Sequence, residues 1–195
     1  DDHYAYFSSY SAGWVAHAKR YAGAMAERLK LGADSLVVEI ASNDGYLLQH
    51  FVAMGVPVLG IEPTANTAEA AIERGVPTEV AFFNAATATD LARRGIEAYL
   101  IAANNVLAHV PDIADFVAGF PIILKREGVL TFEFPHLLKL IELVQFDTIY
   151  HEHYSYLSLV AVEQVLAANG LRPFDARADA DGLLRPYWAS SAGVA

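Results

Sequence analysis

Apolar positions along the chain follow two patterns, one with helical periodicity and one typical of strands. Between residues 12 and 30, apolar side chains recur at intervals of three or four: Trp14, Ala18, Tyr21, Met25 and Leu29. This spacing predicts one amphipathic helix. Residues 35–40 then form a short run rich in β-branched residues, and this run predicts a strand.

The two patterns alternate along most of the chain. Helices are expected at 45–54, 64–74, 84–94, 111–124 and 158–168, and strands at 56–61, 77–81, 97–102 and 128–134, with two more strands after residue 171. Because the strands are near-continuous apolar runs, we expect a mostly parallel sheet that helices cover on both faces. Right-handed crossovers make such a sheet doubly wound, so the predicted fold class is α/β.

The composition agrees with one folded domain. More than half of the 195 residues are hydrophobic and 18% are charged, which is typical of a packed core. A formal net charge of −10 argues against a broad basic surface for nucleic acid. The absence of cysteine excludes a thiolate metal site and a cysteine nucleophile in this sequence. No apolar stretch reaches the roughly 18–20 residues of a membrane span and no signal peptide is recognisable, so we expect a cytoplasmic protein.

Acidic residues end the first two predicted strands. Glu39 lies at the end of the first strand, before the turn 41–45, and Glu62 ends the second strand, before Pro63. In doubly wound sheets, ligands bind at the carboxyl ends of the strands, and an acid at the tip of the second strand commonly binds the two hydroxyls of a ribose. The two acids therefore favour a cofactor that contains a nucleoside.

The turn after the first strand narrows the choice of cofactor. Its sequence, Ala41-Ser42-Asn43-Asp44-Gly45, has one glycine, whereas the pyrophosphate of a dinucleotide needs a glycine-rich turn. An aspartate there repels phosphate but attracts an ammonium group, which favours S-adenosylmethionine over NAD(P). Asp44 could instead cap the following helix. An NAD(P)-dependent oxidoreductase or epimerase stays an alternative, against which the absence of a Tyr-x-x-x-Lys pair also argues.

Five segments resemble, in the same order, the S-adenosylmethionine-dependent C-methyltransferases that act on nucleotide-linked deoxysugars: EIASNDGYLLQHF, GIEPTANTA, NNVLAHVPD, FEFPHL and FDTIYHEHYSYLSL. The resemblance covers roughly residues 4–175, and YHEHYSYLS is its most specific block. It implies a Rossmann-like class I methyltransferase fold with a seven-stranded sheet over residues 31–195, after a helical lead-in or lid over residues 1–30.

The resemblance also implies parts that we do not expect in this chain. In the family, a zinc-binding segment precedes the cofactor domain and a domain that helps to hold the sugar nucleotide follows it. Residues 180–185 read ADGLLR, where the family has a His-Gly-Gly-Ser-Leu-Arg-like block. We therefore expect zinc only in the missing segment, and the chain could be an inert fragment that binds S-adenosylmethionine.

The implied cofactor site lies at the strand ends. The methionine end is expected near Glu39 and the turn, the ribose on Glu62, and the adenine near Pro63. Asn105 is expected beside the path of the methyl group. The full set of implied cofactor residues, including a pocket lid at the start of the chain, is Tyr6, Ser9, Glu39, Ala41, Ser42, Asn43, Asp44, Gly45, Glu62, Pro63, Phe82, Phe83 and Asn105.

The resemblance further implies a base for methylation of a carbon next to a ketone, in a nucleotide-linked keto sugar. The base removes a proton to give an enolate, and histidine suits this task because its pKa of about 6.5 lies near working pH. His153 is the implied base. His109 is implied to help stabilise the enolate. The other implied catalytic residues are Tyr150, Glu152 and Tyr4.

The histidines also have simpler interpretations. His151 and His153 alternate and, with Glu133 or Glu152, could bind a metal, although the resemblance explains these residues without one. His109 could be an ordinary loop residue, and the tyrosine-rich start a packing lid. The remaining histidines are interpreted as surface or helix residues: His3, His17 and His50.

Overall fold

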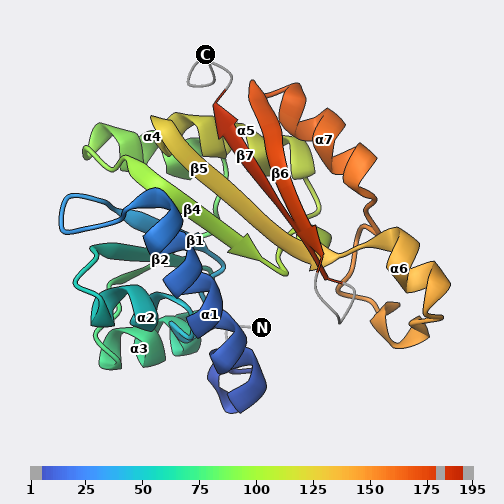
Figure 1. Cartoon of the computed structure of the whole chain (residues 1–195), viewed down its shortest axis with the longest axis horizontal. Helices are drawn as coiled ribbons and strands as arrows, with labels where there is room; N and C mark the ends of the chain where they lie inside the picture. The colour runs from blue at the N-terminus through green and yellow to red at the C-terminus, as the bar shows by residue number, and fades with distance from the viewer. Residues whose placement is uncertain (1–5, 179–182, 191–195) are drawn as a thin grey trace.

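The structure, a computed structural model, describes residues 6–178 and 183–190 (Figure 1). Within these residues the chain forms a seven-stranded sheet of order β3-β2-β1-β4-β5-β7-β6. The strands are β1 (Val37–Ile40), β2 (Val58–Glu62), β3 (Thr78–Val80), β4 (Ala98–Asn104), β5 (Leu124–Pro135), β6 (Leu171–Ala178) and β7 (Leu183–Ser190).

The sheet is mostly parallel and doubly wound, as the sequence predicts. Strands β1 to β5 pair in parallel, whereas β7 runs antiparallel to both β5 and β6. The order changes direction between β1 and β4, which are neighbours in the sheet. This is the switch point at which ligands of such sheets bind, next to the carboxyl ends of the strands.

Helices cover both faces of the sheet (Figure 1). On one face lie α1 (Ala12–Leu29), α2 (Leu48–Ala53) and α3 (Ala65–Glu73), and on the other α4 (Ala85–Arg93), α5 (Ile113–Ile123) and α7 (Leu159–Ala167). A separate apolar cluster fills each of the two layers. The short helix α6 (Leu137–Glu142) follows β5, and single helical turns lie at η1 (Ser8–Tyr10), η2 (Leu107–His109) and η3 (Phe146–Thr148).

The turn after β1 delays the start of the next helix. A helix was predicted from residue 45, but α2 begins at Leu48 because Ala41, Asn43 and Gly45 all have positive φ angles, of 56°, 50° and 77°. At Gly45 a Cβ atom would also lie only 3.0 Å from Val76. A turn with these φ angles cannot be helical, and its backbone N–H groups are bonded within the protein, among them the Asn43 amide to the Glu62 carboxylate.

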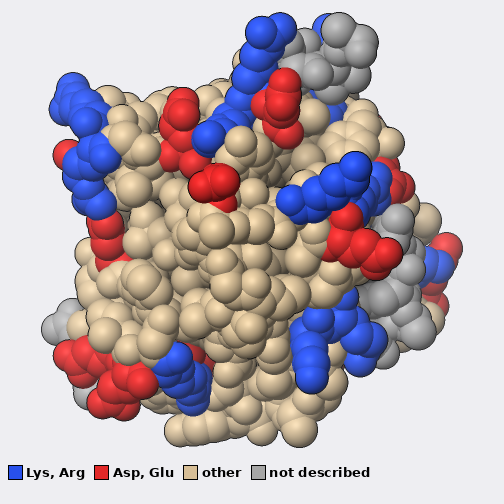
Figure 2. Space-filling view, turned by 60° about the vertical axis from the view of Figure 1, so that its left-hand side comes forward, with Lys and Arg blue, Asp and Glu red and all other residues tan. Residues whose placement is uncertain are grey.

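Charged side chains are dispersed over the surface. On the face shown in Figure 2, Lys and Arg lie in separate groups interspersed with acidic residues, and they form no single basic patch there. Of the helices in the described part of the chain, none has the length and apolar character that crossing a bilayer requires.

Candidate active site

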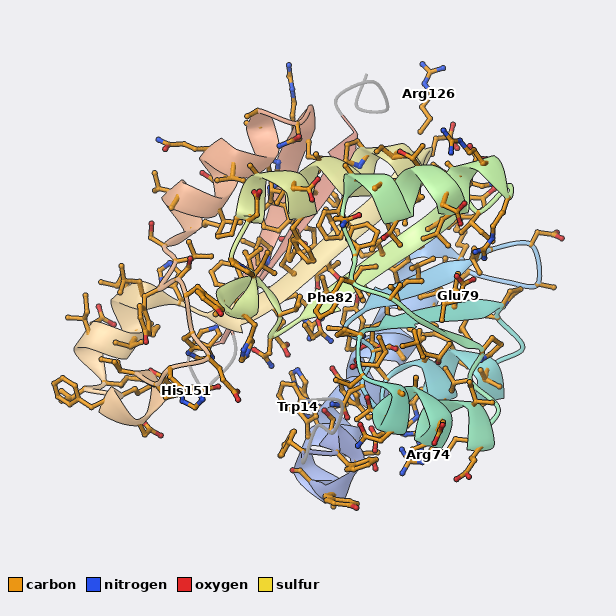
Figure 3. The ribbon with its side chains drawn as sticks, turned by 180° about the vertical axis from the view of Figure 1, so that it is seen from behind. Trp14, Arg74, Glu79, Phe82, Arg126 and His151 are labelled. Atoms are coloured by element: carbon orange, nitrogen blue, oxygen red, sulfur yellow. The ribbon has the colours of Figure 1, made fainter. Side chains whose placement is uncertain are left out.

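A cavity of about 980 Å³ lies at the carboxyl ends of β1, β2 and β4. Its walls come from segments far apart in the sequence, among them the turn after β1, the end of β2, residues 150–152 and Tyr154. Figure 3 shows Trp14, Phe82 and His151 on three separate segments, and all three line the cavity. A cavity of this volume can hold a cofactor and part of a second molecule.

The turn after β1 is tied to the start of the chain. The Asn43 side chain accepts a hydrogen bond from the Ser8 amide, at 2.9 Å, and donates one to the Tyr6 carbonyl, at 3.1 Å. Ala41, Asn43, Tyr6 and Ser8 all line the cavity. The N-terminal segment therefore lies against the cofactor residues that the sequence predicts.

The Asp44 side chain has its partners inside the protein. Its side chain is fully buried, forms an ion pair with Arg74 at 2.6 Å and accepts hydrogen bonds from the Ser9 amide and hydroxyl. Besides Glu39, four residues of the implied cofactor set do not line the cavity: Ser9, Ser42, Asp44 and Gly45. The alternative role of Asp44 as a helix cap is wrong, because Leu47 occupies the N-cap of α2 and that cap has no side-chain hydrogen bond.

Glu39 lies beneath the turn and is completely buried. Neither of its carboxyl oxygens has a well-formed hydrogen bond to any residue that the structure describes. Burial raises the pKa of Glu39 well above its ordinary value, and the nearby Tyr46 hydroxyl only partly offsets this. Glu39 is not in the cavity wall, whereas the next two residues, Ile40 and Ala41, are.

Glu62 lies in the cavity wall and is held in place. It accepts hydrogen bonds from the Asn43 amide at 2.8 Å, from the Thr64 amide at 3.0 Å and from the Thr64 hydroxyl. Because a carboxylate has about four acceptor positions, these bonds leave capacity for a ligand. Pro63 lines the cavity beside it.

Two phenylalanines follow β3 and differ in environment. The Phe82 side chain lines the cavity and is 76% exposed, so its ring is available to a ligand. Phe83 is buried between Phe116 and Phe120, with ring centroids 5.7 and 4.9 Å away, and contributes to both the core and the wall. Of these two implied cofactor residues, Phe82 has the free surface that a ring of the cofactor can contact.

A histidine and tyrosine cluster closes another part of the cavity. His109, Tyr150, His151 and Glu152 line it, and Tyr154 extends the same wall. Burial, and secondly the neighbouring His153, lower the pKa of His109. Tyr4 lies outside the described residues.

His153 packs behind this wall. Its ring centroid is 4.2 Å from that of Tyr150 and 4.7 Å from that of His109, and it is absent from the cavity lining. Its Nδ1 lies 2.8 Å from the Thr148 carbonyl oxygen. Because a carbonyl oxygen only accepts hydrogen bonds, Nδ1 carries the hydrogen and Nε2 is left to accept a proton.

Glu133 belongs to a cluster that the sequence analysis missed. It forms ion pairs with Arg185 and with His17, at 2.8 Å; His17 is a helix residue, as expected, but its contact with Glu133 was not predicted. Burial alone would raise the pKa of Glu133, but His17 and Arg185 lower it below its ordinary value. No group of three or more potential metal-ligating side chains occurs among the described residues.

Asparagines at the end of β4 connect this cluster to the cavity. Both Asn104 and Asn105 line it, and Asn105 has a positive φ of 50°. Asn104 accepts a hydrogen bond from Arg185 at 3.0 Å and donates one to the Tyr46 hydroxyl at 3.3 Å. Only Asn105 was predicted, although the paired asparagines at a strand end were a usable signal for both.

The "Methyltransferase domain" family matches residues 14–175 of the chain. The chain belongs to this methyltransferase domain family. A curated relative, the C-methyltransferase NovU of Streptomyces niveus, is 36% identical over 173 residues. That match covers 89% of this chain but 41% of NovU, so the chain spans less than half the length of the curated relative that it matches.

Solved structures of methyltransferase domains have the same fold. The CcbJ methyltransferase of Streptomyces caelestis has a TM-score of 0.72 at 12% identity, covering 89% of each chain. The magnesium protoporphyrin IX methyltransferase of Synechocystis, solved with S-adenosylhomocysteine, has a TM-score of 0.70 at 13% identity, covering 92% of this chain and 84% of its own. These neighbours confirm the predicted Rossmann-like class I methyltransferase fold.

Proposed function

We propose that the chain carries the cofactor and base residues of an S-adenosylmethionine-dependent C-methyltransferase. Its substrate is a nucleotide-linked deoxysugar with a carbon next to a ketone. The observation that carries the proposal is that Glu62, at the ribose position of the sheet, lines the same cavity as His109 and Tyr150. The name of the 36% identical relative, a C-methyltransferase, supports carbon as the atom that is methylated.

The chemistry of the cavity fits the cofactor. Glu62 has about one acceptor position left for a ribose hydroxyl, and the exposed Phe82 ring offers a face to the adenine. Glu39 supplies a buried carboxyl group next to the strand end where the ammonium group would lie. When bound, S-adenosylmethionine supplies an electrophilic methyl group on a positively charged sulfur.

Two histidines supply the acid–base chemistry. His153 accepts the proton from the carbon next to the ketone through Nε2, and His109 donates a hydrogen bond to the ketone oxygen as it becomes negative. Because His153 does not line the cavity and Tyr150 packs against it, this role requires Tyr150, which is 41% exposed, to move aside when substrate enters. The Thr148 carbonyl keeps the base in the tautomer that can accept a proton.

Charge decides how the substrate enters. The described residues that line the cavity include no Lys or Arg, but they include the acids Glu62, Asp112, Asp115 and Glu152. A diphosphate carries negative charge and would be repelled there. The sugar ring therefore enters the cavity, and the nucleoside diphosphate stays on the solvent side.

Two measurements on the chain test this function. Titration calorimetry with S-adenosylhomocysteine, NAD and NADP separates the methyltransferase from the oxidoreductase or epimerase: binding of the first alone is expected, and binding of NAD or NADP alone would overturn the proposal. The second incubates a nucleoside-diphosphate-linked 4-keto-6-deoxy sugar in D2O with S-adenosylhomocysteine and follows deuterium uptake next to the ketone. Cofactor binding without deuterium uptake would leave an inert cofactor-binding fragment.

A further inference from the structure

Asn104 is held in one orientation by two partners on different elements. Its Oδ1 accepts from Arg185 Nη1 at 3.0 Å, and its Nδ2 donates to the Tyr46 hydroxyl at 3.3 Å. A guanidinium group has donors and no acceptor, so the amide oxygen and not the amide nitrogen must face Arg185. The amide nitrogen carries two hydrogens, and one of them is left for a ligand of the cavity that Asn104 lines.

Arg185 is itself firmly anchored. Its side chain is 9% exposed and is paired with Glu133, whose side chain is 1% exposed. Its guanidinium carbon lies 3.9 Å from the centroid of the Tyr21 ring, and the Tyr21 hydroxyl is bonded to Thr131 at 2.6 Å. Because these contacts hold the Arg185 side chain in one position, Arg185 can set the orientation of the Asn104 amide.

The place of Asn104 in the cavity indicates which part of the cofactor it meets. With the ribose on Glu62 and the adenine on Phe82, the amino-acid end of the cofactor extends away from β2 and β3 to the wall of Tyr46, Trp14 and Asn104. The carboxylate at that end is the only anionic group of S-adenosylmethionine. A fixed N–H donor is suited to an anionic oxygen.

We propose that Asn104 donates a hydrogen bond to the carboxylate of the cofactor, and that Arg185 is a positioning residue that holds the Asn104 amide in the donating orientation. This inference rests on the proposed function. It adds a recognition site for the amino-acid end of the cofactor. This site lies at the end of β4 and uses no residue of the turn after β1.

The test compares two ligands by titration calorimetry: S-adenosylhomocysteine and its decarboxylated analogue, which keeps the amine and thioether. The parent chain is expected to prefer S-adenosylhomocysteine by roughly 10- to 100-fold, the range of a hydrogen bond to a charged group. Asn104→Ala should abolish most of this preference by weakening S-adenosylhomocysteine alone. Asn104→Asp should reverse it, because two carboxylates repel.

Arg185 is tested by the same quantity, the ratio of the affinities for S-adenosylhomocysteine and for its decarboxylated analogue. Arg185→Met should lower the preference for the carboxylate, and Arg185→Lys, which keeps a donor and the charge opposite Glu133, should restore part of it. Phe82→Ala is the matched control, since it should weaken both ligands by the same factor. Circular dichroism identifies variants that do not fold. If Arg185→Met does not fold, the test of Arg185 rests on Arg185→Lys.

The possible contrary results are distinct. Equal weakening of both ligands by Asn104→Ala would overturn the hydrogen bond to the carboxylate. A parent-like ratio in folded Arg185→Met would overturn the positioning role alone. A parent chain that binds neither ligand but binds NAD would overturn the proposed function itself.

Discussion

The imidazole rings of His109 and His153 lie with their centroids 4.7 Å apart, nearly perpendicular to each other. Burial lowers the pKa of His109, and electrostatic repulsion from the neighbouring His153 lowers it further. His109 is therefore neutral at pH 7. A neutral imidazole keeps one N–H, through which His109 can donate a hydrogen bond to the ketone oxygen.

His153→Asn tests the assignment of the base. The rate of deuterium uptake next to the ketone should fall by about 100-fold or more, since general-base catalysis commonly contributes 10²–10⁴. The affinity for S-adenosylhomocysteine should stay as it is, because His153 does not line the cavity. His50→Asn on α2 is the control. Exchange that survives in His153→Asn and disappears in His109→Asn would make His109 the base.

Glu62→Gln tests the ribose site. The variant should bind S-adenosylhomocysteine about tenfold or more weakly, because a hydrogen bond to a charged group is replaced by one to a neutral group. Glu69→Gln, an exposed position on α3, gives the matched control. Calorimetry measures both. Parent-like affinity in Glu62→Gln would place the ribose elsewhere in the cavity.

The sequence predicts the layers of the fold and the acids at the strand ends well. Helices and strands can be predicted because the periodicity of apolar residues is visible within short stretches of the sequence. Glu39 and Glu62 could be found because each follows a recognisable apolar run. The antiparallel direction of β7 was not predicted, because its pairing with β5 depends on residues far away in the chain.

The interior polar partners could not be read from the sequence. Arg185 pairs with Glu133 across 52 residues and with Asn104 across 81, and no local pattern marks such pairs. The same holds for Asp44, whose partner Arg74 lies on the far end of α3. Helical spacing places His17 on the same face of α1 as Trp14 and Tyr21, but its contact with Glu133 spans 116 residues and no local pattern marks it.

Arg74→Ala is expected to destabilise the fold. Arg74 donates to the Asp44 carboxylate and carbonyl, both at 2.6 Å, and to the Ser9 hydroxyl at 2.8 Å. Without it, a buried carboxylate keeps only the Ser9 donors, which should cost roughly 1–3 kcal/mol of unfolding free energy. Urea denaturation measures the change. Arg93→Ala, at an exposed position on α4, should unfold like the parent, and equal midpoints for all three proteins would contradict a structural role for the pair.

Glu39→Gln should make the unliganded protein more stable at neutral pH. The pKa of Glu39 in the folded state is raised well above its ordinary 4.5 by burial, so above pH 4.5 the unfolded chain loses a proton that the folded chain keeps. This contribution lowers the stability of the parent progressively as pH rises from 4.5 towards the folded pKa. Urea denaturation at pH 5 and pH 7.5 should therefore show a gain from Glu39→Gln that is larger at pH 7.5. Glu97→Gln, at an exposed position, should show no such difference, and a gain for Glu39→Gln that is the same at both pH values would mean that Glu39 is ionised in the folded protein.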